Sequence, residues 1–390
     1  MKDFGSCRIL IRGTNWLGDA VMTTPALLRL REKFPAAHIA LLTPEKLADL
    51  WLNHPAINET IVFAPNDGVF SVAGKLRGGR FDAALVLPNS PRSALEVFLA
   101  GIPNRIGYSR PLRNWFLTQA VAQRADAAKM RKRTVNEIKA LIAANPRSVP
   151  RKSQYSSSAH QSREYLHLGA ALGANPEPLP AALFVTPQEV EVARQKFDLS
   201  AISGPIFGIN PGAEYGPAKR WPVERYIAAA KEIQEKTKCA WIVFGGRNDT
   251  ELAGQIQSAL GGKRESFSSP SSNNSRLGEP AIFNVAGRTS LRELMSLMKL
   301  CRVFLTNDTG PMHVAAALGV PVVAIFGSTS PELTAPLAAS ESLLKILRSD
   351  VPCSPCFLRE CPIDFRCMNG ISVEQVVEAV LAHSAPTPCP

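Results

Sequence analysis

The sequence predicts an α/β protein of two doubly wound domains, and three observations lead to that prediction. The chain has 390 residues, a length that favours two domains over one. Two separate series of apolar, β-rich runs alternate with amphipathic stretches, as parallel sheets covered by helices require. Polar, glycine-containing segments follow several of those runs directly. We therefore expect a cleft that faces the carboxyl ends of both sheets, where such folds bind ligands.

The first series predicts a domain over residues 1–180. Its strands are expected at 8–11, 38–42, 60–63, 83–87 and 105–108, with helices at 25–34, 93–100 and 163–172. Residues 145–162 (NPRSVPRKSQYSSSAHQS) are rich in proline, serine and basic residues. This composition predicts a disordered insertion.

The second series predicts a domain over residues 188–350. Strands are expected at 206–209, 240–244, 282–285, 303–306 and 322–326, and helices at 223–236, 250–260, 291–298 and 312–318. Residues 261–280 are a second low-complexity insertion. Residues 351–390 are expected to form a separate cysteine-rich segment with a final helix at 373–383.

Composition and charge narrow the class of protein. Hydrophobic residues make up 45% and charged residues 20%, as in soluble globular proteins, and the formal net charge is +11. Such a charge attracts phosphates, nucleic acid or an anionic membrane face, or serves solubility alone. The start of the chain lacks the pattern of a secretory signal, and apolar runs such as 321–326 are strand-sized. We expect a cytoplasmic protein.

The eight cysteines fall into distinct groups. Cys7, Cys239 and Cys301 lie in apolar contexts and are predicted to be buried thiols, whereas Cys389 is in the tail. The remaining four form the pattern C-x2-C-x4-C-x5-C, at Cys353, Cys356, Cys361 and Cys367. In a cytosolic chain this density indicates metal or redox chemistry rather than disulfides. The alternative is four reduced thiols in a partly buried loop.

A first polar segment, RGTNWLGDAVMTTP (12–25), joins the first predicted strand to a helix. Asp19 is placed at the start of that helix, at the edge of the sheet where ligands bind. A carboxylate there can accept a proton from an acceptor hydroxyl. It can equally serve only as a helix cap, which aspartate does well.

Two segments of the second series have the features of an anion site. In NPGAEYGPAKRWP (210–222), Gly212 and Gly216 permit close backbone approach, and Lys219 and Arg220 offer cations. The alternative is a surface loop with solvated cations; Trp221 is expected to be a packed anchor. In TNDTGPMHVAAAL (306–318), a helix starts at Thr309 and Gly310, and free N–H groups there favour anions. His313 is either a ligand contact or a core residue.

Together these motifs resemble the ADP-heptose:lipopolysaccharide heptosyltransferases, glycosyltransferase family 9, and within it the heptosyltransferase II branch. The resemblance rests on WLGDAVMTTPAL (16–27), VLPNSPRSALEVFLAGIPNRIGY (86–108), NPGAEYGPAKRWP (210–222) and TNDTGPMHVAAALGVPVVAIFGSTSPELTAPL (306–337). The segment CSPCFLRECPIDFRCM (353–368) also resembles the tail of many members. The match extends over nearly the whole chain.

This resemblance implies a GT-B fold of two Rossmann-like domains, with acceptor bound by the first and ADP-heptose by the second. It makes Asp19 the catalytic base. The implied donor contacts are Gly212, Glu214, Lys219, Gly287, Thr289, Asp308, Thr309, Gly310 and His313. Lys219 would meet the diphosphate, and Gly287 and Thr289 fall where adenine or ribose is expected. Acceptor contacts are expected at Asn15, Arg92, Arg105 and Arg110, with Arg113 as a further candidate.

The implied reaction is inverting transfer of heptose from ADP-L-glycero-D-manno-heptose to the inner core of lipopolysaccharide. No Asp-x-Asp motif lies near the expected donor site, so we expect no catalytic metal and no cofactor. The expected partners are ADP-heptose, the anionic core acceptor and the inner-membrane surface, and not nucleic acid. Alternatives are heptosyltransferase I or III, a transferase for another nucleotide sugar, or a non-catalytic nucleotide-sugar binding protein.

Overall fold

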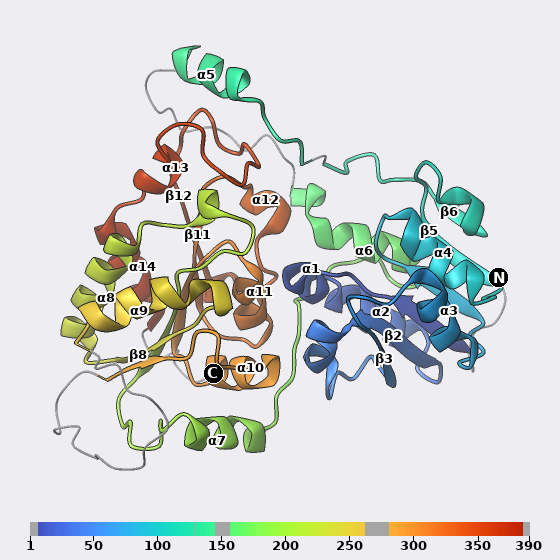
Figure 1. Ribbon diagram of the computed structural model, residues 1–390, viewed down its shortest axis with the longest axis horizontal. Helices are drawn as coiled ribbons and strands as arrows, with labels where there is room; N and C mark the ends of the chain where they lie inside the picture. The colour runs from blue at the N-terminus through green and yellow to red at the C-terminus, as the bar shows by residue number, and fades with distance from the viewer. Residues whose placement is uncertain (1–6, 129, 145–156, 262–280, 385–390) are drawn as a thin grey trace. The chain divides into compact units, whose positions relative to one another are not determined.

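The computed structural model describes residues 7–128, 130–144, 157–261 and 281–384. Its contacts divide the chain into two compact units. Unit 1 comprises residues 1–129 and 154–184, and unit 2 comprises residues 130–153 and 185–390. Each unit has its own parallel sheet, so the predicted pair of α/β domains is confirmed (Figure 1).

Unit 1 contains a six-stranded sheet in the order β3-β2-β1-β4-β5-β6, and every described pairing is parallel. Its strands are β1 (Arg8–Arg12), β2 (His38–Pro44), β3 (Glu59–Phe63), β4 (Ala83–Val86), β5 (Asn104–Tyr108) and β6 (Gln119–Val121). Its α-helices are α1 (Leu17–Met22), α2 (Thr24–Lys33), α3 (Val69–Arg77), α4 (Pro91–Leu99) and α6 (Gln161–Ala170). The central strands are almost wholly buried because helices cover both faces of the sheet.

Unit 2 contains a second six-stranded sheet in the order β12-β11-β10-β7-β8-β9, again paired in parallel. Its strands are β7 (Ile206–Asn210), β8 (Ala240–Val243), β9 (Ile282–Asn284), β10 (Val303–Asn307), β11 (Val322–Phe326) and β12 (Leu344–Arg348). Its α-helices are α5 (Val135–Ala144), α7 (Pro187–Lys196), α8 (Val223–Thr237), α9 (Thr250–Ala259), α10 (Leu291–Lys299), α11 (Gly310–Ala317), α12 (Pro331–Thr334), α13 (Arg366–Asn369) and α14 (Val373–Ser384).

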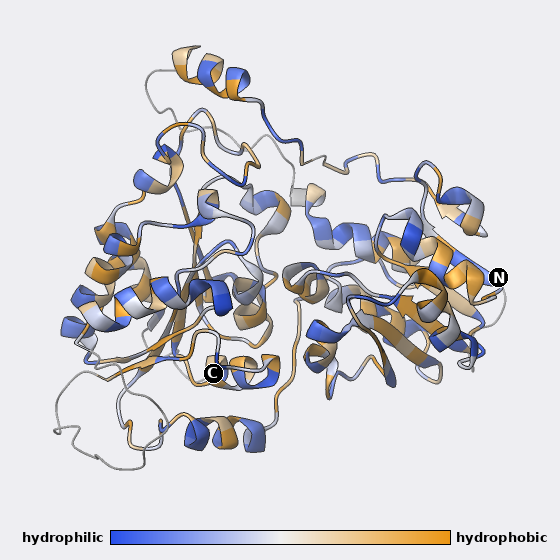
Figure 2. Ribbon diagram, in the orientation of Figure 1, coloured by the Kyte–Doolittle hydropathy of each residue, from blue (hydrophilic) through white to orange (hydrophobic). Residues whose placement is uncertain are grey.

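Burial follows hydropathy in both units (Figure 2). Strands such as β11, with the sequence VVAIF, are apolar along their whole length and fully buried. The long helix α8 is amphipathic, with Tyr226 and Ile233 in the core and lysines toward solvent. This combination is what a parallel sheet covered by helices requires. None of the helices within the described residues is long and apolar enough to cross a membrane.

The structure differs from the sequence prediction at the margins of the units. Residues 157–162, expected in a disordered insertion, form the 3-10 helix Ser157–Ala159 and the start of α6, which begins two residues before the predicted helix. The rest of that insertion, residues 145–156, and nearly all of the second, residues 262–280, lie outside the described residues. The short strand β6 and the half-exposed strand β12 were not predicted, because neither has a long apolar run.

The expected domain boundaries also differ from the observed units. Residues 130–153, placed in the first domain by the prediction, belong to unit 2. Residues 351–384 are not a separate segment, since Met368, Val376 and Val380 lie in the same hydrophobic core as Trp241. Helix α14 packs against α8, so it completes unit 2.

Candidate active site

In unit 1, Asp19 lies in the first turn of the short helix α1, just after β1. Trp16 occupies the N-cap position of this helix, and its side chain makes no capping hydrogen bond. Asp19 is therefore not the N-cap residue. Its carboxylate accepts a hydrogen bond from Gln161 Nε2 at 3.0 Å, and Gln161 also donates to the Tyr165 hydroxyl at 3.0 Å. Gln161 belongs to α6, so two elements far apart in sequence set the orientation of Asp19.

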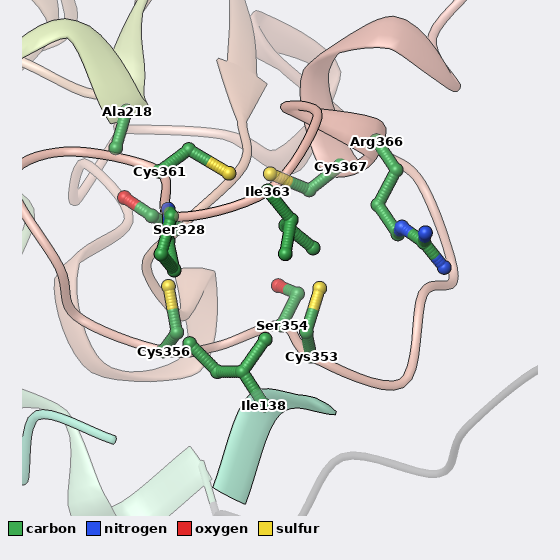
Figure 3. Close-up of a pocket in the computed structure, with 11 residues that line it drawn as sticks. Ile138, Ala218, Ser328, Cys353, Ser354, Cys356, Cys361, Ile363, Arg366 and Cys367 are labelled. Carbon is green, nitrogen blue, oxygen red and sulfur yellow. The ribbon is translucent and has the colours of Figure 1, made fainter. Parts of the chain in front are cut away.

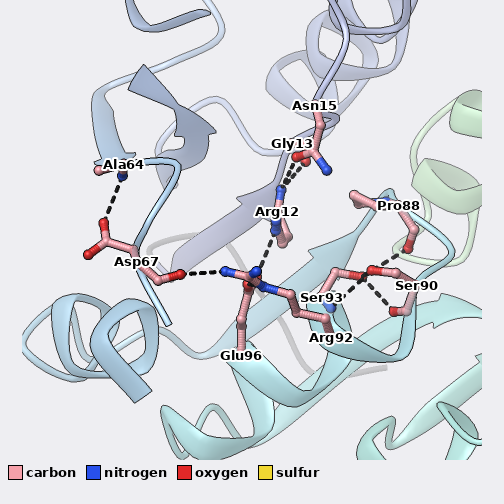
Figure 4. Close-up of polar contacts among 10 residues, drawn as sticks. All are labelled: Arg12, Gly13, Asn15, Ala64, Asp67, Pro88, Ser90, Arg92, Ser93 and Glu96. Carbon is pink, nitrogen blue, oxygen red and sulfur yellow. Dashed lines mark hydrogen bonds and ion pairs between the residues drawn. The ribbon is translucent and has the colours of Figure 1, made fainter. Parts of the chain in front are cut away.

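A buried ion pair supports the loop that carries Asp19 (Figure 4). Arg12 Nε lies 2.9 Å from Glu96 Oε2, with side chains 3% and 0% exposed. Arg12 Nη1 donates to the Gly13 carbonyl at 2.7 Å and to Asn15 Oδ1 at 3.0 Å. Arg92 contacts the other Glu96 oxygen at 3.0 Å and donates to the Asp67 carbonyl. Asn15 and Arg92, both predicted acceptor contacts, are therefore parts of one structural network; the sequence did not reveal Glu96.

Arg113 is the least expected arginine of unit 1, because it is fully buried. It donates from Nη1 to Asn89 Oδ1 at 3.1 Å, while Nε and Nη2 have no hydrogen-bond partner. Burial, together with the nearby charge of Arg110, lowers the pKa of Arg113 to about 10. A Cβ at Gly107 would lie 2.7 Å from Arg113 Nη2, so a larger residue there would displace the guanidinium. Arg110 is half-buried and precedes this guanidinium by three residues.

Arg105 does not lie with the other arginines that were predicted to contact the acceptor. Its expected role as an acceptor contact is therefore corrected. It lies near the start of β5, level with Leu10 and Ala84, whereas Gly107 is level with Arg12. Its guanidinium donates to the carbonyls of Phe116 at 2.7 Å and Ile102 at 2.5 Å. It also lies 5.3 Å from the Phe98 ring centroid. Arg105 therefore fastens the loop after β5 at the opposite end of the strand from Asp19.

In unit 2, the loop after β7 is locked to the end of β10 by an asparagine that the sequence analysis did not single out. Asn307 Nδ2 donates to the Pro211 carbonyl at 2.8 Å, and Asn307 Oδ1 accepts from the Trp221 backbone N–H at 3.1 Å. Trp221 is 2% exposed and packs against Tyr226, which confirms it as an anchor. Both ends of the loop that carries Lys219 are thus fixed.

Lys219 forms an ion pair with Asp308 within this fixed frame. The Nζ–Oδ2 distance is 2.5 Å, and the side chains are 13% and 4% exposed. Thr329, from the loop after β11, donates to the same carboxylate oxygen of Asp308 at 2.5 Å. The Lys219 ammonium also lies 5.0 Å from the Tyr215 ring centroid. Asp308 thus positions Lys219, which leaves the ammonium partly accessible at the carboxyl edge of the sheet.

The glycines of the loop serve internal packing. A Cβ at Gly212 would lie 2.3 Å from the Asp249 carboxylate, and one at Gly216 would lie 2.5 Å from the Arg359 carbonyl oxygen. Gly216 also has φ of +149°, which disfavours other residues. Asp249 in turn pairs with Arg220 at 3.4 Å. The close approach predicted at both glycines is therefore to the protein's own atoms.

The remaining predicted donor residues lie on loops that follow strands of the unit 2 sheet or in the first turn of α11. Thr309 is the N-cap of α11 and Gly310 begins the helix, as predicted. His313 is buried, 5% exposed, in the same helix. Glu214 is exposed and Thr289 half-buried. Gly287 has φ of +72° and donates its N–H to the Gly245 carbonyl at 3.0 Å, so it shapes the turn after β9.

The cysteines are placed largely as predicted. Cys239 and Cys301 are buried in the core of unit 2, whereas Cys7 is only half-buried at the start of β1. The four clustered thiols, Cys353, Cys356, Cys361 and Cys367, line one small cavity. As the side chains stand, no group of three or more His, Cys, Asp or Glu within the described ranges is set to hold a metal ion.

The chain is similar to known proteins in both sequence and fold. Residues 69–365 match the model of glycosyltransferase family 9 (heptosyltransferase). Lipopolysaccharide heptosyltransferase 2 of Salmonella typhimurium is 31% identical over 347 residues, covering 87% of this chain and 88% of that protein. The structure of Escherichia coli ADP-heptose LPS heptosyltransferase II has a TM-score of 0.73 at 27% identity, covering 97% and 98% of the two chains.

A further solved structure shares the fold at low identity. Escherichia coli heptosyltransferase WaaC with ADP-2-deoxy-2-fluoro heptose has a TM-score of 0.61 at 15% identity, covering 95% and 98% of the chains. The family match spans most of this chain and joins both units. The chain therefore belongs to glycosyltransferase family 9, the heptosyltransferase family, and is a glycosyltransferase.

Proposed function

We propose that this protein transfers heptose from ADP-L-glycero-D-manno-heptose to the inner core of lipopolysaccharide, as a heptosyltransferase II. The observation that carries the proposal is that each unit contributes one positioned charged group. Gln161 orients the Asp19 carboxylate in unit 1, and Asp308 positions the Lys219 ammonium in unit 2. The 31% identity to lipopolysaccharide heptosyltransferase 2 across most of both chains supports the choice of sugar and acceptor.

Unit 2 holds the donor in this proposal. The Lys219 ammonium has three N–H donors, so it can keep its bond to Asp308 while it binds a diphosphate oxygen. The N-terminus of α11, at Thr309 and Gly310, adds backbone donors and the positive end of a helix dipole. Both stabilise the negative charge that grows on ADP as it leaves. Asp308 acts through Lys219, because a buried carboxylate would repel phosphate.

Unit 1 supplies the base. Asp19 takes the proton of the acceptor hydroxyl while that oxygen bonds to the anomeric carbon of heptose. The bond from that carbon to the phosphate oxygen breaks, and ADP leaves with the electron pair. One direct displacement inverts the anomeric configuration. The neutral amide of Gln161 orients the carboxylate and does not neutralise its charge. Burial, and less so the charge of Asp19, raises the pKa of Tyr165, so its phenol stays protonated.

The acceptor side of the proposal now favours Arg110, which is half-buried, over the other predicted arginines. Arg113 is 0% exposed, so an anionic group of the lipopolysaccharide core would meet Arg110 and not Arg113. Arg92 and Asn15 contribute through the Glu96–Arg12 network, so we assign them a supporting role. This assignment differs from the prediction that all the arginines contact the acceptor directly.

We further propose that the protein works in the cytoplasm at the inner-membrane surface. Next to Arg110, the loop after β5 exposes Leu112 by 77% and Trp115 by 86%. Exposed tryptophan and leucine beside arginine are typical of contact with an anionic bilayer. Vesicles of phosphatidylglycerol should co-sediment the protein, and a Leu112→Ser/Trp115→Ser variant should bind less. Phe70→Ser is the matched control, since Phe70 is 77% exposed in helix α3 of unit 1. Equal binding of both variants would contradict this contact.

A transfer assay tests the main proposal. Purified protein is mixed with ADP-heptose and lipopolysaccharide core that ends in a single heptose, and mass spectrometry follows the acceptor. We expect the acceptor to gain one heptose with inverted anomeric configuration. UDP-glucose and GDP-mannose serve as competing donors. Transfer from either of these alone, or hydrolysis of ADP-heptose with no change of acceptor, would contradict the proposal.

A further inference from the structure

Four cysteines of unit 2 line one small cavity, although they are spread over fifteen residues of sequence. Figure 3 shows Cys353, Cys356, Cys361 and Cys367 around that cavity, with Ile138 of α5 and Ile363 completing its wall. Cys353, Cys356 and Cys367 are 6%, 9% and 7% exposed, and Cys361 is half-buried. Four free thiols at one buried point are an unusual arrangement for side chains whose only role is packing.

The chain around these thiols has little regular secondary structure. Between β12 and α14, the described chain forms a single regular element, the four-residue helix α13. Cys353 and Cys356 pack with Ile138 in a small hydrophobic cluster, whereas Cys367 lies in the main core of the unit. Loop-rich segments are commonly stabilised by a metal or by disulfides. The four cysteines form no disulfide, so they are available as metal ligands.

Charge around the cavity fits such a metal. A divalent ion bound by four thiolates carries a net charge of −2. Two arginines adjoin the thiols. Arg366 lines the cavity itself, and Arg133 donates from its backbone N–H to the Cys356 carbonyl at 3.0 Å and from Nη1 to the Pro352 carbonyl at 3.1 Å. Arg366 is also paired with Asp364 at 2.9 Å, so the two arginines would offset only part of the charge of the complex.

We propose that Cys353, Cys356, Cys361 and Cys367 bind one divalent metal ion of the zinc class as a tetrathiolate. Four thiolates in tetrahedral geometry are the preferred ligands of such ions. The sulfurs are not set for a metal ion as the side chains now stand, so binding must bring them closer together. Each thiol releases its proton to solvent, and no electron is transferred.

This site would hold the loop that carries Lys219. The Phe357 carbonyl accepts from the Tyr215 hydroxyl at 2.7 Å, and the Arg359 carbonyl accepts from the Ala218 N–H at 3.0 Å. The N–H groups of Cys356 and Phe357 donate to the Ser328 carbonyl, next to Thr329, at 3.1 and 2.8 Å. Both loops that position Asp308 and Lys219 therefore rest on the cysteine segment. Metal binding should accordingly favour donor binding, a consequence that rests on the proposed function.

Cobalt substitution tests the site without any assay of activity. The full chain, purified under reducing conditions and stripped of metal, is titrated with Co2+. We expect one Co2+ per chain, with the visible absorption bands of a tetrahedral cobalt thiolate, and displacement of Co2+ by Zn2+. Cys361→Ser, at the most exposed of the four, should lose the tetrathiolate spectrum. Cys7→Ser, at a half-buried thiol in unit 1, should keep it.

Several results would overturn the proposal. Wild-type protein that gives no thiolate bands, or a Cys361→Ser variant that keeps the wild-type spectrum, excludes the four-cysteine site. Acid-labile sulfide in protein as purified would mean an iron–sulfur cluster in place of a single ion. Separately, ADP affinity should rise about fivefold or more on Zn2+ loading, within the usual range of coupling between sites. Unchanged ADP affinity beside intact cobalt bands would refute only the coupling, and the metal site would stand.

Discussion

The two units each place a nearly buried ion pair at the carboxyl edge of the sheet, and the pairs differ in what they leave accessible. Arg12 and Glu96 in unit 1 are 3% and 0% exposed, whereas Lys219 in unit 2 is 13% exposed against 4% for Asp308. The guanidinium of Arg12 is further occupied by Gly13, Asn15 and the Phe63 ring. The Arg12–Glu96 pair is inaccessible to solvent and structural. The Lys219–Asp308 pair leaves the Lys219 ammonium accessible to a ligand.

Breaking the closed pair should have the largest effect. Glu96→Gln keeps the hydrogen-bond acceptor for Arg12 but leaves its charge buried without a counter-charge. Removal of one partner of a buried pair typically costs about 3–5 kcal/mol. Burial already lowers the pKa of Arg12, and Glu96 opposes that shift. Urea denaturation should show this loss of unfolding free energy; a loss below about 1 kcal/mol, the level of an exposed pair, would contradict the assignment.

Asp19→Asn should have the next largest effect, and on catalysis alone. The substitution keeps the size of the side chain and its ability to accept from Gln161, but an amide cannot take the acceptor proton. We expect transfer to fall by about a hundredfold or more, the usual contribution of a general base. ADP affinity and melting temperature should stay near the parent values.

Comparison of Asp19→Asn with Asp19→Ala separates an effect on catalysis from an effect on helix stability. Since Asp19 lies in the first turn of α1, Asp19→Ala would also lose a favourable interaction with the helix dipole, about 0.3–1 kcal/mol. An Asp19→Asn protein that transfers heptose at the parent rate would return Asp19 to a structural role.

Lys219→Ala should weaken ADP binding by about ten- to a hundredfold, because charged hydrogen bonds are worth about 1.5–3 kcal/mol. Isothermal titration calorimetry measures the effect. The control Lys236→Ala removes an exposed lysine paired with Glu232 in α8 and should bind ADP normally.

Loss of Lys219 also leaves the Asp308 carboxylate buried without its counter-charge. The effect of this buried charge on stability therefore needs a separate control. In a Lys219→Ala/Asp308→Asn variant, the buried charge is gone and stability should recover, but ADP binding should not. Recovery of ADP binding in this double variant would show that Lys219 only neutralises Asp308.

The smallest effect is expected at an exposed pair. Arg8 and Glu59 lie 3.4 Å apart in unit 1, with side chains 38% and 44% exposed. Glu59→Gln should cost less than about 1 kcal/mol, and salt should reduce the difference from the parent. Thermal melting at low and high sodium chloride measures it. A cost equal to that of Glu96→Gln would mean that burial does not decide the strength of these pairs.

The sequence predicted the strands and helices of both units better than it predicted which side chains contact one another. Apolar runs such as VVAIF and periodic stretches such as 223–236 determine strands and helices locally, so ten of the observed strands and most long helices were anticipated. The helix start at Thr309 and Gly310 was predicted because few structures other than a helix start fit a strand end followed by glycine. Glu96, Asn307 and Gln161 were missed, since nothing in their local sequence shows that they meet Arg12, Trp221 and Asp19.

By itself, the sequence determined the two parallel α/β sheets, the family and the loops where chemistry is expected. Those features depend on short-range patterns of hydrophobicity and on residue types next to strand ends. Only the tertiary structure decided which arginines are closed in ion pairs, that Arg105 lies at the far end of its strand, and that four cysteines share a cavity. Those outcomes depend on contacts between residues far apart in the chain, whose burial and charge are set only when the sheets and helices pack.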